Sequence, residues 1–122
     1  MKINRFEDVE AWQVARTLCG AVYEVINKGD FTKSFALRDQ IDRSSGSVMD
    51  NIAEGFDSGT DPEFIRFLSY AQRSSSEVKS QLYRALDRKF INQDEFDSIH
   101  ELADKTHRKT GALIKYLKSC RK

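Results

Sequence analysis

The sequence predicts an all-α fold: an antiparallel up-down-up-down bundle of four helices. Apolar residues recur at steps of three and four along four segments of the chain, the period of helices that bury one face. The connections between these segments are only a few residues long, so consecutive helices are expected to be antiparallel neighbours. No segment shows the alternation of apolar and polar residues that is typical of a half-buried strand.

Length and composition indicate one domain over residues 1–122, because a chain of 122 residues is the usual size for a single core. The formal net charge is +1, so the overall charge does not by itself imply a nucleic-acid partner. Cys19 and Cys120 lie far apart without a CxxC motif, which favours a reduced, cytoplasmic protein. The start of the chain lacks the apolar core of a signal peptide, and no apolar run is long enough to span a membrane.

The first helix is predicted over 7–28. Two adjacent apolar rows follow it, made up of Ala11, Trp12, Val14, Ala15, Leu18, Cys19, Ala21, Val22, Val25 and Ile26. Such a wide stripe predicts that this helix packs against more than one neighbour. A further hypothesis is that Val14, Leu18 and Val25 exceed what one bundle core covers and leave an apolar strip for self-association.

The second helix is predicted over 36–56, after a connection whose aromatic residues Phe31 and Phe35 are expected to pack against the bundle. Four consecutive small residues, 44–47, allow another helix to approach closely. Gly55 is predicted to end this helix. The acidic residues of the opposite face are expected to be solvated; they are Asp39, Asp50, Glu54 and Asp57.

The third helix is predicted over 61–88, because Thr60 with Glu63 forms a capping-box pattern and Pro62 falls in the first turn. Its buried seam is expected to be Phe64, Leu68, Ala71, Ser75, Val78, Leu82 and Ala85. The fourth helix is predicted over 93–119, with Asn92 and Glu95 as a second capping-box pattern. Its seam is expected to be Phe96, Ile99, Ala103, Thr106, Thr110, Leu113 and Leu117.

The sequence predicts no enzyme. It contains no GxSxG elbow, phosphate-binding loop or HExxH motif, and no cofactor is expected. The nearest approach to a metal site is His100, Asp104 and His107, but the two histidines are roughly 10 Å apart along the helix and a third ligand is missing. We therefore interpret them as ordinary solvated or boundary histidines. A small hydrolase or metal enzyme is the least favoured class.

The basic C-terminal stretch is the best indication of nucleic-acid binding. From Lys105 onward the chain has seven Lys or Arg and no acidic residue. Such side chains can neutralise phosphates, and Tyr116 is available for base stacking. Candidate nucleic-acid-binding residues are Arg66, Arg73, Arg84, Lys105, Arg108, Lys109, Lys115, Lys118, Arg121 and Lys122. The alternative is that these cations only complement the dipole at a helix C-terminus.

Three stretches resemble one protein family. Residues 6–15 (Phe-Glu-Asp-Val-Glu-Ala-Trp-Gln-Val-Ala) resemble its opening signature, and Asn-Ile-Ala-Glu-Gly at 51–55 resembles its central one. The further matching positions are Leu37, Gln40, Arg43, Ser47, Val48, Phe64, Phe67, Leu68, Ala71, Ser74, Glu77, Gln81, Leu82 and Ala85. Together they resemble the four-helix bundle proteins of the 23S rRNA intervening-sequence family.

This resemblance implies a homopentameric assembly of four-helix bundles, and for most members no defined activity. A related branch, the accessory proteins of diversity-generating retroelements, is basic and binds nucleic acid and a reverse transcriptase. This chain departs from the family pattern at three points. Met49 replaces a proline that bends the second helix, Arg73 and Ser75 replace a glycine and an apolar residue, and the net charge is close to zero.

Polar residues of the second and third helices are expected to form a structural network between helices or subunits; they are Gln40, Asn51, Glu54, Ser74, Glu77 and Gln81. Two functional hypotheses stay open. The first is a non-enzymatic, oligomeric scaffold that contacts RNA or a ribonucleoprotein through its basic C-terminal helix. The second is a purely structural or protein-binding bundle with no nucleic-acid role.

Overall fold

The prediction of four helices is confirmed by a computed structural model of the protein, which describes residues 3–120. The four helices are α1 (Glu10–Ile26), α2 (Phe35–Asp57), α3 (Asp61–Asp87) and α4 (Gln93–Ser119). Two short 3-10 turns, η1 (Phe6–Asp8) and η2 (Gly29–Lys33), precede α1 and α2. Residues 3–120 contain no strand, and none of their helices is both long and apolar enough to cross a membrane.

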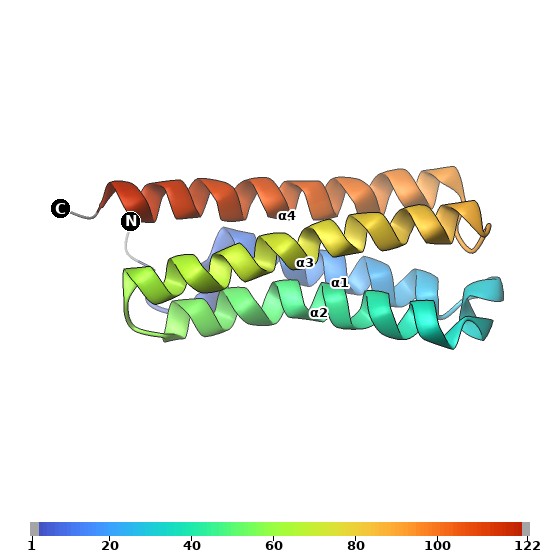
Figure 1. The fold of residues 1–122 in the computed structure, drawn as a ribbon, viewed down its shortest axis with the longest axis horizontal. Helices are drawn as coiled ribbons and strands as arrows, with labels where there is room; N and C mark the ends of the chain where they lie inside the picture. The colour runs from blue at the N-terminus through green and yellow to red at the C-terminus, as the bar shows by residue number, and fades with distance from the viewer. Residues whose placement is uncertain (1–2, 121–122) are drawn as a thin grey trace.

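The helices lie side by side along one long axis, and the chain reverses direction from each helix to the next (Figure 1). The start of α1 and the end of α4 consequently lie at the same end of the bundle (Figure 1). α1 and α3 each pack against both α2 and α4, so α2 and α4 occupy opposite corners. The contact between α2 and α3 is the most extensive.

Local signals set the helix starts. Asn92 Oδ1 accepts a hydrogen bond from Glu95 N at 2.8 Å, and Glu95 Oε1 accepts one from Asn92 N at 2.9 Å, which completes the predicted capping box of α4. At α3, Thr60 Oγ1 accepts from Glu63 N at 3.3 Å. The capping box of α3 is only half formed, because the Glu63 carboxylate binds Arg66, with an Nη2–Oε2 distance of 2.6 Å, and not the backbone N–H of Thr60. Both helices therefore start where the sequence predicts.

The buried seams follow the predicted period. Every predicted seam residue of α3 is buried, as are those of α4 except the partly buried Leu113. Hydroxyl groups within the seams are satisfied locally: Ser75 Oγ donates to Ala103 O at 2.7 Å, and Thr110 Oγ1 donates to Thr106 O at 3.0 Å. The hydroxyl-bearing seam residues Ser75, Thr106 and Thr110 are tolerated because each has a backbone acceptor.

The apolar strip predicted on the first helix is wrong. Val14, Leu18 and Val25 are all buried within a single chain. α1 packs against α2 on one side and α4 on the other, so both of its apolar rows are covered inside the bundle. The wide stripe reflects two neighbours within the bundle rather than an exposed surface.

Gly55 does not end α2, as the sequence predicted, because the helix continues to Asp57. Its role is steric. A Cβ atom at Gly55 would lie 2.8 Å from Phe67 Cβ and 2.9 Å from Phe64 Cδ1, closer than real Cβ contacts allow. Gly55 therefore lets the backbone of α2 approach α3. α2 also runs without interruption past Met49, consistent with the lack of a proline at this position.

The two aromatics of the connection behave differently. Phe31 is fully buried and stacks on Phe90 with ring centroids 5.2 Å apart, as predicted. Phe35, in contrast, is 77% exposed. It belongs to the first turn of α2 and lies two residues before the buried Leu37, which places it about 200° around the helix from the core side.

Replacement of Gly55 by Ala is expected to destabilise the bundle. The added Cβ overlaps Phe67 and Phe64, and such overpacking destabilises a protein by about 1–3 kcal/mol. The higher helix propensity of Ala offsets at most about 1 kcal/mol of this loss. Chemical denaturation measures the difference.

The matched control is Gly20→Ala in α1, where an added Cβ meets nothing within 4 Å. This control should gain up to about 1 kcal/mol. Equal stability changes in the two variants would contradict the steric role of Gly55.

Candidate functional site

Small polar side chains join α2 to α3. Ser47 Oγ accepts hydrogen bonds from Asn51 Nδ2 at 2.9 Å and from Ser74 Oγ at 3.0 Å. Asn51 Nδ2 also donates to Ser47 O at 2.8 Å, which holds the amide against its own helix. Ser74 is buried, so its hydroxyl depends on this partner. Ser47 is therefore the link between the two helices.

A second group lies further along the same contact. Gln81 Nε2 donates to Ser44 Oγ at 3.0 Å, and Arg84 Nη2 donates to Gln40 Oε1. We call the hydrogen-bonded residues Ser44, Ser47, Asn51, Ser74 and Gln81 the polar seam. A groove of about 320 Å³ opens over it, lined by Gln40, Arg43, Ser44, Ser47, Glu77 and Gln81.

Four of the six predicted network residues are hydrogen-bonded, and their bonds do not form one continuous chain: Asn51 and Ser74 meet at Ser47, Gln81 binds Ser44, and Gln40 binds Arg84. Glu54 and Glu77 are exposed and make no hydrogen bond within residues 3–120. Gln81 Oε1 is buried and has no hydrogen-bond partner in that range either. A structural role of the network stays a prediction.

The three candidate arginines of α3 are exposed, and each has an intramolecular contact. Arg66 binds Glu63 and donates to the Tyr70 hydroxyl at 3.1 Å, and the hydrogen bond to Glu63 raises the pKa of the guanidinium. Arg73 lies over the Tyr70 ring, 5.4 Å from its centroid. Arg84 is the residue bound to Gln40. Arg73 is the one of the three without a polar partner in the described part of the chain.

The candidate cations of α4 divide into paired and unpaired groups. Lys109 Nζ lies 2.7 Å from Glu10 Oε1 of α1, and this hydrogen bond holds the pKa of Glu10 below its usual range. Arg108 binds Glu101 at 3.0 Å and Asp104 at 2.7 Å. The exposed residues without an ion pair among residues 3–120 are Lys105, Lys115 and Lys118. Arg121 and Lys122 lie outside the described residues.

These cations lie on two flanks of α4. Lys109 marks the flank toward α1 through its pair with Glu10. Arg108 marks the flank toward α3, because its partner Asp104 also binds Lys79 of α3 at 3.2 Å. Helical spacing places Lys105 with Lys109, and Lys115 and Lys118 with Arg108. The basic stretch is therefore not one surface.

Two side chains with catalytic potential, His100 and Cys19, pack against their neighbours, whereas the buried Nδ1 of His107 has no hydrogen-bond partner within residues 3–120. No group of three or more His, Cys, Asp or Glu residues within 3–120 is placed to hold a metal ion. His100 stacks on Phe96 with ring centroids 5.2 Å apart. Burial raises the pKa of the Cys19 thiol to about 11, and its Sγ donates to Ser45 O at 3.1 Å. Cys19 is therefore a packed thiol rather than an activated nucleophile.

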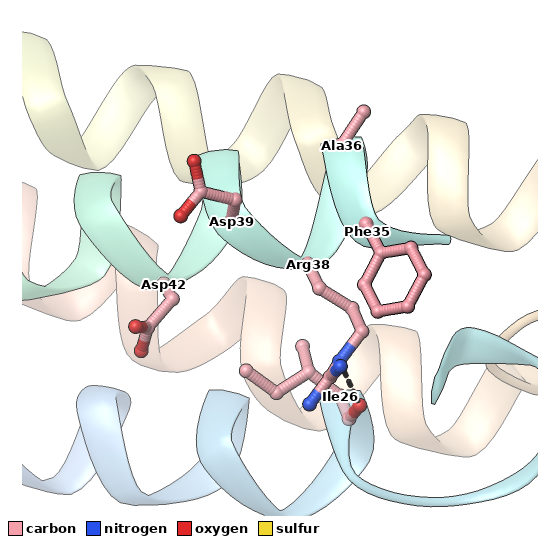
Figure 2. Close-up of a pocket in the computed structure, with 6 residues that line it drawn as sticks. All are labelled: Ile26, Phe35, Ala36, Arg38, Asp39 and Asp42. Carbon is pink, nitrogen blue, oxygen red and sulfur yellow. Dashed lines mark hydrogen bonds between the residues drawn. The ribbon is translucent and has the colours of Figure 1, made fainter. Parts of the chain in front are cut away.

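A groove of about 540 Å³ lies between the end of α1 and the start of α2. It is lined by Ile26, Phe35, Ala36, Arg38, Asp39 and Asp42, and we call it the α1–α2 groove. Figure 2 shows the Phe35 ring and the Asp42 carboxylate on the side of α2 that faces α1, with Arg38 between them. Arg38 Nε donates to Ile26 O at 2.9 Å, so it caps α1 (Figure 2).

Sequence analysis missed this groove. Phe35 was expected to be covered, and Asp42 was assigned no role. One signal was available: Phe35 is out of phase with the inner row of α2 that begins at Leu37 and Ile41. An aromatic residue out of phase with the buried row of its helix is expected to be exposed.

Fold and surface together define a small all-α bundle protein with a polar helix contact and a divided basic helix. A family model described as 23S rRNA-intervening sequence protein matches residues 7–112. The chain therefore belongs to the 23S rRNA-intervening sequence protein family.

Comparison with solved structures supports the fold. A crystal structure at 1.70 Å resolution of a protein of unknown function from the S23 ribosomal protein family of Bacteroides thetaiotaomicron VPI-5482 is similar to this chain, with a TM-score of 0.73. The two share 22% sequence identity over 86% of this chain and 94% of the other. No curated protein matches the chain. The family and the neighbouring structure establish the architecture without an assigned activity.

Replacement of Asn51 by Ala is expected to cost about 0.5–1.5 kcal/mol of stability, because Ser47 loses one of its two hydrogen-bonded side chains. Combining Asn51→Ala with Ser74→Ala tests whether both act through Ser47. Their effects on urea denaturation should be non-additive by at least about 0.5 kcal/mol. Additive effects, or a loss of binding activity with stability intact, would show that Asn51 belongs to a binding site instead of the polar seam.

Proposed function

We propose that this protein is a non-enzymatic, cytoplasmic scaffold. In this proposal the antiparallel bundle is the protomer of a homopentamer, and the C-terminal half of α4 contacts RNA or a ribonucleoprotein. The observation that carries the proposal is the set of exposed cations Lys115 and Lys118, which have no ion pair within residues 3–120 and follow the last acidic residue of α4.

The RNA contact is proposed for the flank of α4 toward α3. Arg108 lies on this flank with Lys115 and Lys118. Unpaired lysines suit this role better than paired ones. A lysine already bound to a carboxylate must give up that partner before it binds phosphate, whereas an unpaired lysine only releases counterions on the RNA. Several copies in one assembly multiply a weak contact of this kind.

The double variant Lys115→Ala/Lys118→Ala tests the RNA contact by titrating binding of single-stranded RNA with salt. A plot of the logarithm of the RNA-binding constant against the logarithm of the salt concentration has a negative slope. Loss of two phosphate contacts should make this slope shallower by about 1.4, at about 0.7 for each contact. The matched control is Arg16→Ala/Arg88→Ala, which removes two exposed cations outside α4 that have no ion pair within residues 3–120. If the wild-type protein binds no RNA even at low salt, the proposed RNA contact is refuted.

The oligomeric state has its own test. Five chains of 14.1 kDa have a combined mass of about 70 kDa, which light scattering or sedimentation equilibrium distinguishes from one chain. We expect that mass at micromolar concentration and moderate salt. A mass near that of one chain at every concentration would contradict the proposal of a homo-oligomer.

The second candidate is a protein-binding bundle with no nucleic-acid role. The observation that favours it is the exposure of large apolar side chains: Phe35, which lines the α1–α2 groove, is 77% exposed, and Tyr23 of α1 is 64% exposed. An assembled protein without measurable RNA affinity supports this candidate over the first.

A further inference from the structure

We infer that neighbouring copies of this chain meet through α2 of one copy and α4 of the next, with the two helices running parallel. The two surfaces are the outer row of α2, made up of Gly46, Asp50, Ala53 and Asp57, and the outer row of α4, made up of Lys105, Ala112 and Tyr116. This inference rests on the proposed homo-oligomer. It adds which two surfaces meet and in which direction they run.

The outer row of α2 faces away from the core and carries unpaired acids. Asp50 follows the fully buried Ile41 by nine residues, which places it about 180° around the helix from the core side. Asp50 and Asp57 are exposed, and neither has an ion pair within residues 3–120. From Ser44 to Asp57 the sequence contains no Lys or Arg. This half of α2 is therefore an acidic surface to which the described part of the chain pairs no cation.

Small side chains along the outer row of α2 allow another helix to come close. A Cβ atom at Gly46 would meet nothing within 4 Å, so packing inside the bundle does not require a glycine there. Glycine in a helix interior is less stable than alanine, and the single chain offers no compensation at Gly46. A helix of a second copy lying against Gly46 and Ala53 supplies it, because small residues let two backbones approach.

The outer row of α4 has the complementary chemistry. Lys105 is exposed without an ion pair within residues 3–120, Ala112 is small and exposed, and Tyr116 is 63% exposed. No acidic residue follows Asp104 in α4. Tyrosine is enriched in the buried centres of interfaces. An unpaired lysine can meet a carboxylate of another copy without giving up a partner of its own.

The topology of the bundle makes the two helices parallel. α2 and α4 run in the same direction, because two chain reversals separate them, and both end where the two termini lie (Figure 1). Rotation about an axis along the bundle keeps this direction from copy to copy. The acidic end of α2 therefore lies beside the basic end of α4 in the next copy. An antiparallel pairing would bring the same acids toward the start of α4, which carries Asp94 and Asp97.

The spacing of the two rows sets the register. The residues of the α2 row recur at steps of four, three and four, and the same steps on α4 run from Lys105 through Lys109 and Ala112 to Tyr116. Setting Ala53 beside Ala112 therefore aligns the two rows along their whole length.

In this register the acids of α2 meet suitable donors. Asp57 lies level with Tyr116, whose hydroxyl can donate to its carboxylate. Lys105 lies one turn, about 6 Å, from the level of Asp50, a distance that its four-carbon side chain spans. Lys109 lies level with Asp50 but keeps Glu10 of its own chain as its partner at 2.7 Å, so the contact does not depend on it.

Both rows lean toward α1, which curves the assembly. Gly46 follows Asp42 by one turn, and Asp42 lines the α1–α2 groove. Ala112 and Tyr116 line a groove of about 970 Å³ together with Gln13 of α1. α2 and α4 occupy opposite corners, so two contacts on their α1 sides lie less than half a turn apart around the bundle. Repetition of such a heterologous contact bends around α1 and closes into a ring.

The ring leaves the proposed RNA surface free. With α1 on the inside, α3 and the flank of α4 toward α3 lie on the outside. Lys115 and Lys118 of every copy then face outward, so the contact between copies does not compete with RNA.

Exchange of charges tests the pairing of Asp50 with Lys105. Asp50→Lys and Lys105→Asp should each raise the dissociation constant of self-association roughly tenfold or more at low salt, because like charges then face each other. The double variant Asp50→Lys/Lys105→Asp should recover most of the wild-type affinity, since opposite charges again face each other. The matched control, Asp87→Lys, reverses an exposed charge on α3 and should leave association unchanged.

Sedimentation equilibrium measures these dissociation constants, and far-UV circular dichroism checks that each variant keeps its helices. Weakened single variants without recovery in the double variant would overturn the pairing of Asp50 with Lys105. Single variants that associate as tightly as the wild type would overturn the inferred contact and leave the proposed homo-oligomer standing. A wild-type mass of one chain at every concentration would refute the proposed homo-oligomer and the inference together.

Disulfide trapping tests the direction of the two helices. In a background of Cys120→Ser, Ala53→Cys/Ala112→Cys should give covalent oligomers larger than a dimer under mild oxidation, because each copy joins two neighbours. The matched control is Ala36→Cys/Ala112→Cys, since Ala36 is also exposed on α2 but lies in its first turn. Larger oligomers from the control pair instead would overturn the parallel arrangement. Dimers from Ala53→Cys alone would overturn it in favour of a symmetric contact.

Discussion

The close approach of α2 to α3 is the constraint on which the rest of the bundle depends. The missing side chain of Gly55 and the small side chains of Ser44, Ser47 and Ser74 let these two helices form the most extensive contact in the molecule. α2 contributes a buried aliphatic row to the core, Leu37, Ile41, Val48 and Ile52, and the hydrogen bonds of the polar seam lie beside it. Interiors tolerate such groups only when they are paired, and Ser47 supplies the pairing. α1 and α4 then complete a core around this pair of helices.

Electrostatics within the chain decide which charges are available to partners. Lys109 and Arg108 are held by carboxylates, so their charge is already partly neutralised. Exposed pairs of this kind contribute little to stability, but they divide the basic stretch of α4 into two flanks with different neighbours. One flank keeps free lysines beside α3, and the other presents Tyr116 and Lys105. A near-neutral chain can thus still carry a local basic surface, which net charge alone does not reveal.

Membership in the 23S rRNA-intervening sequence protein family establishes the architecture of this chain but assigns it no activity. The bundle of the Bacteroides relative persists at 22% identity, as expected when a fold depends on the period of buried positions more than on particular side chains. This chain keeps a continuous α2 through Met49.

The sequence by itself determined the number of helices, their approximate ends and their buried seams. These features depend on local physics: the 3.6-residue period, and caps such as Asn92 with Glu95 in which both partners lie within one turn. Only the tertiary structure decided that Gly55 packs against Phe67 instead of ending a helix, that Val14 is covered, and that Phe35 is exposed. It also decided which lysines of the candidate site are paired, since Lys109 meets Glu10 from the other end of the chain. Contacts between distant residues leave no periodic signal along the chain, so they appear only when the helices are packed.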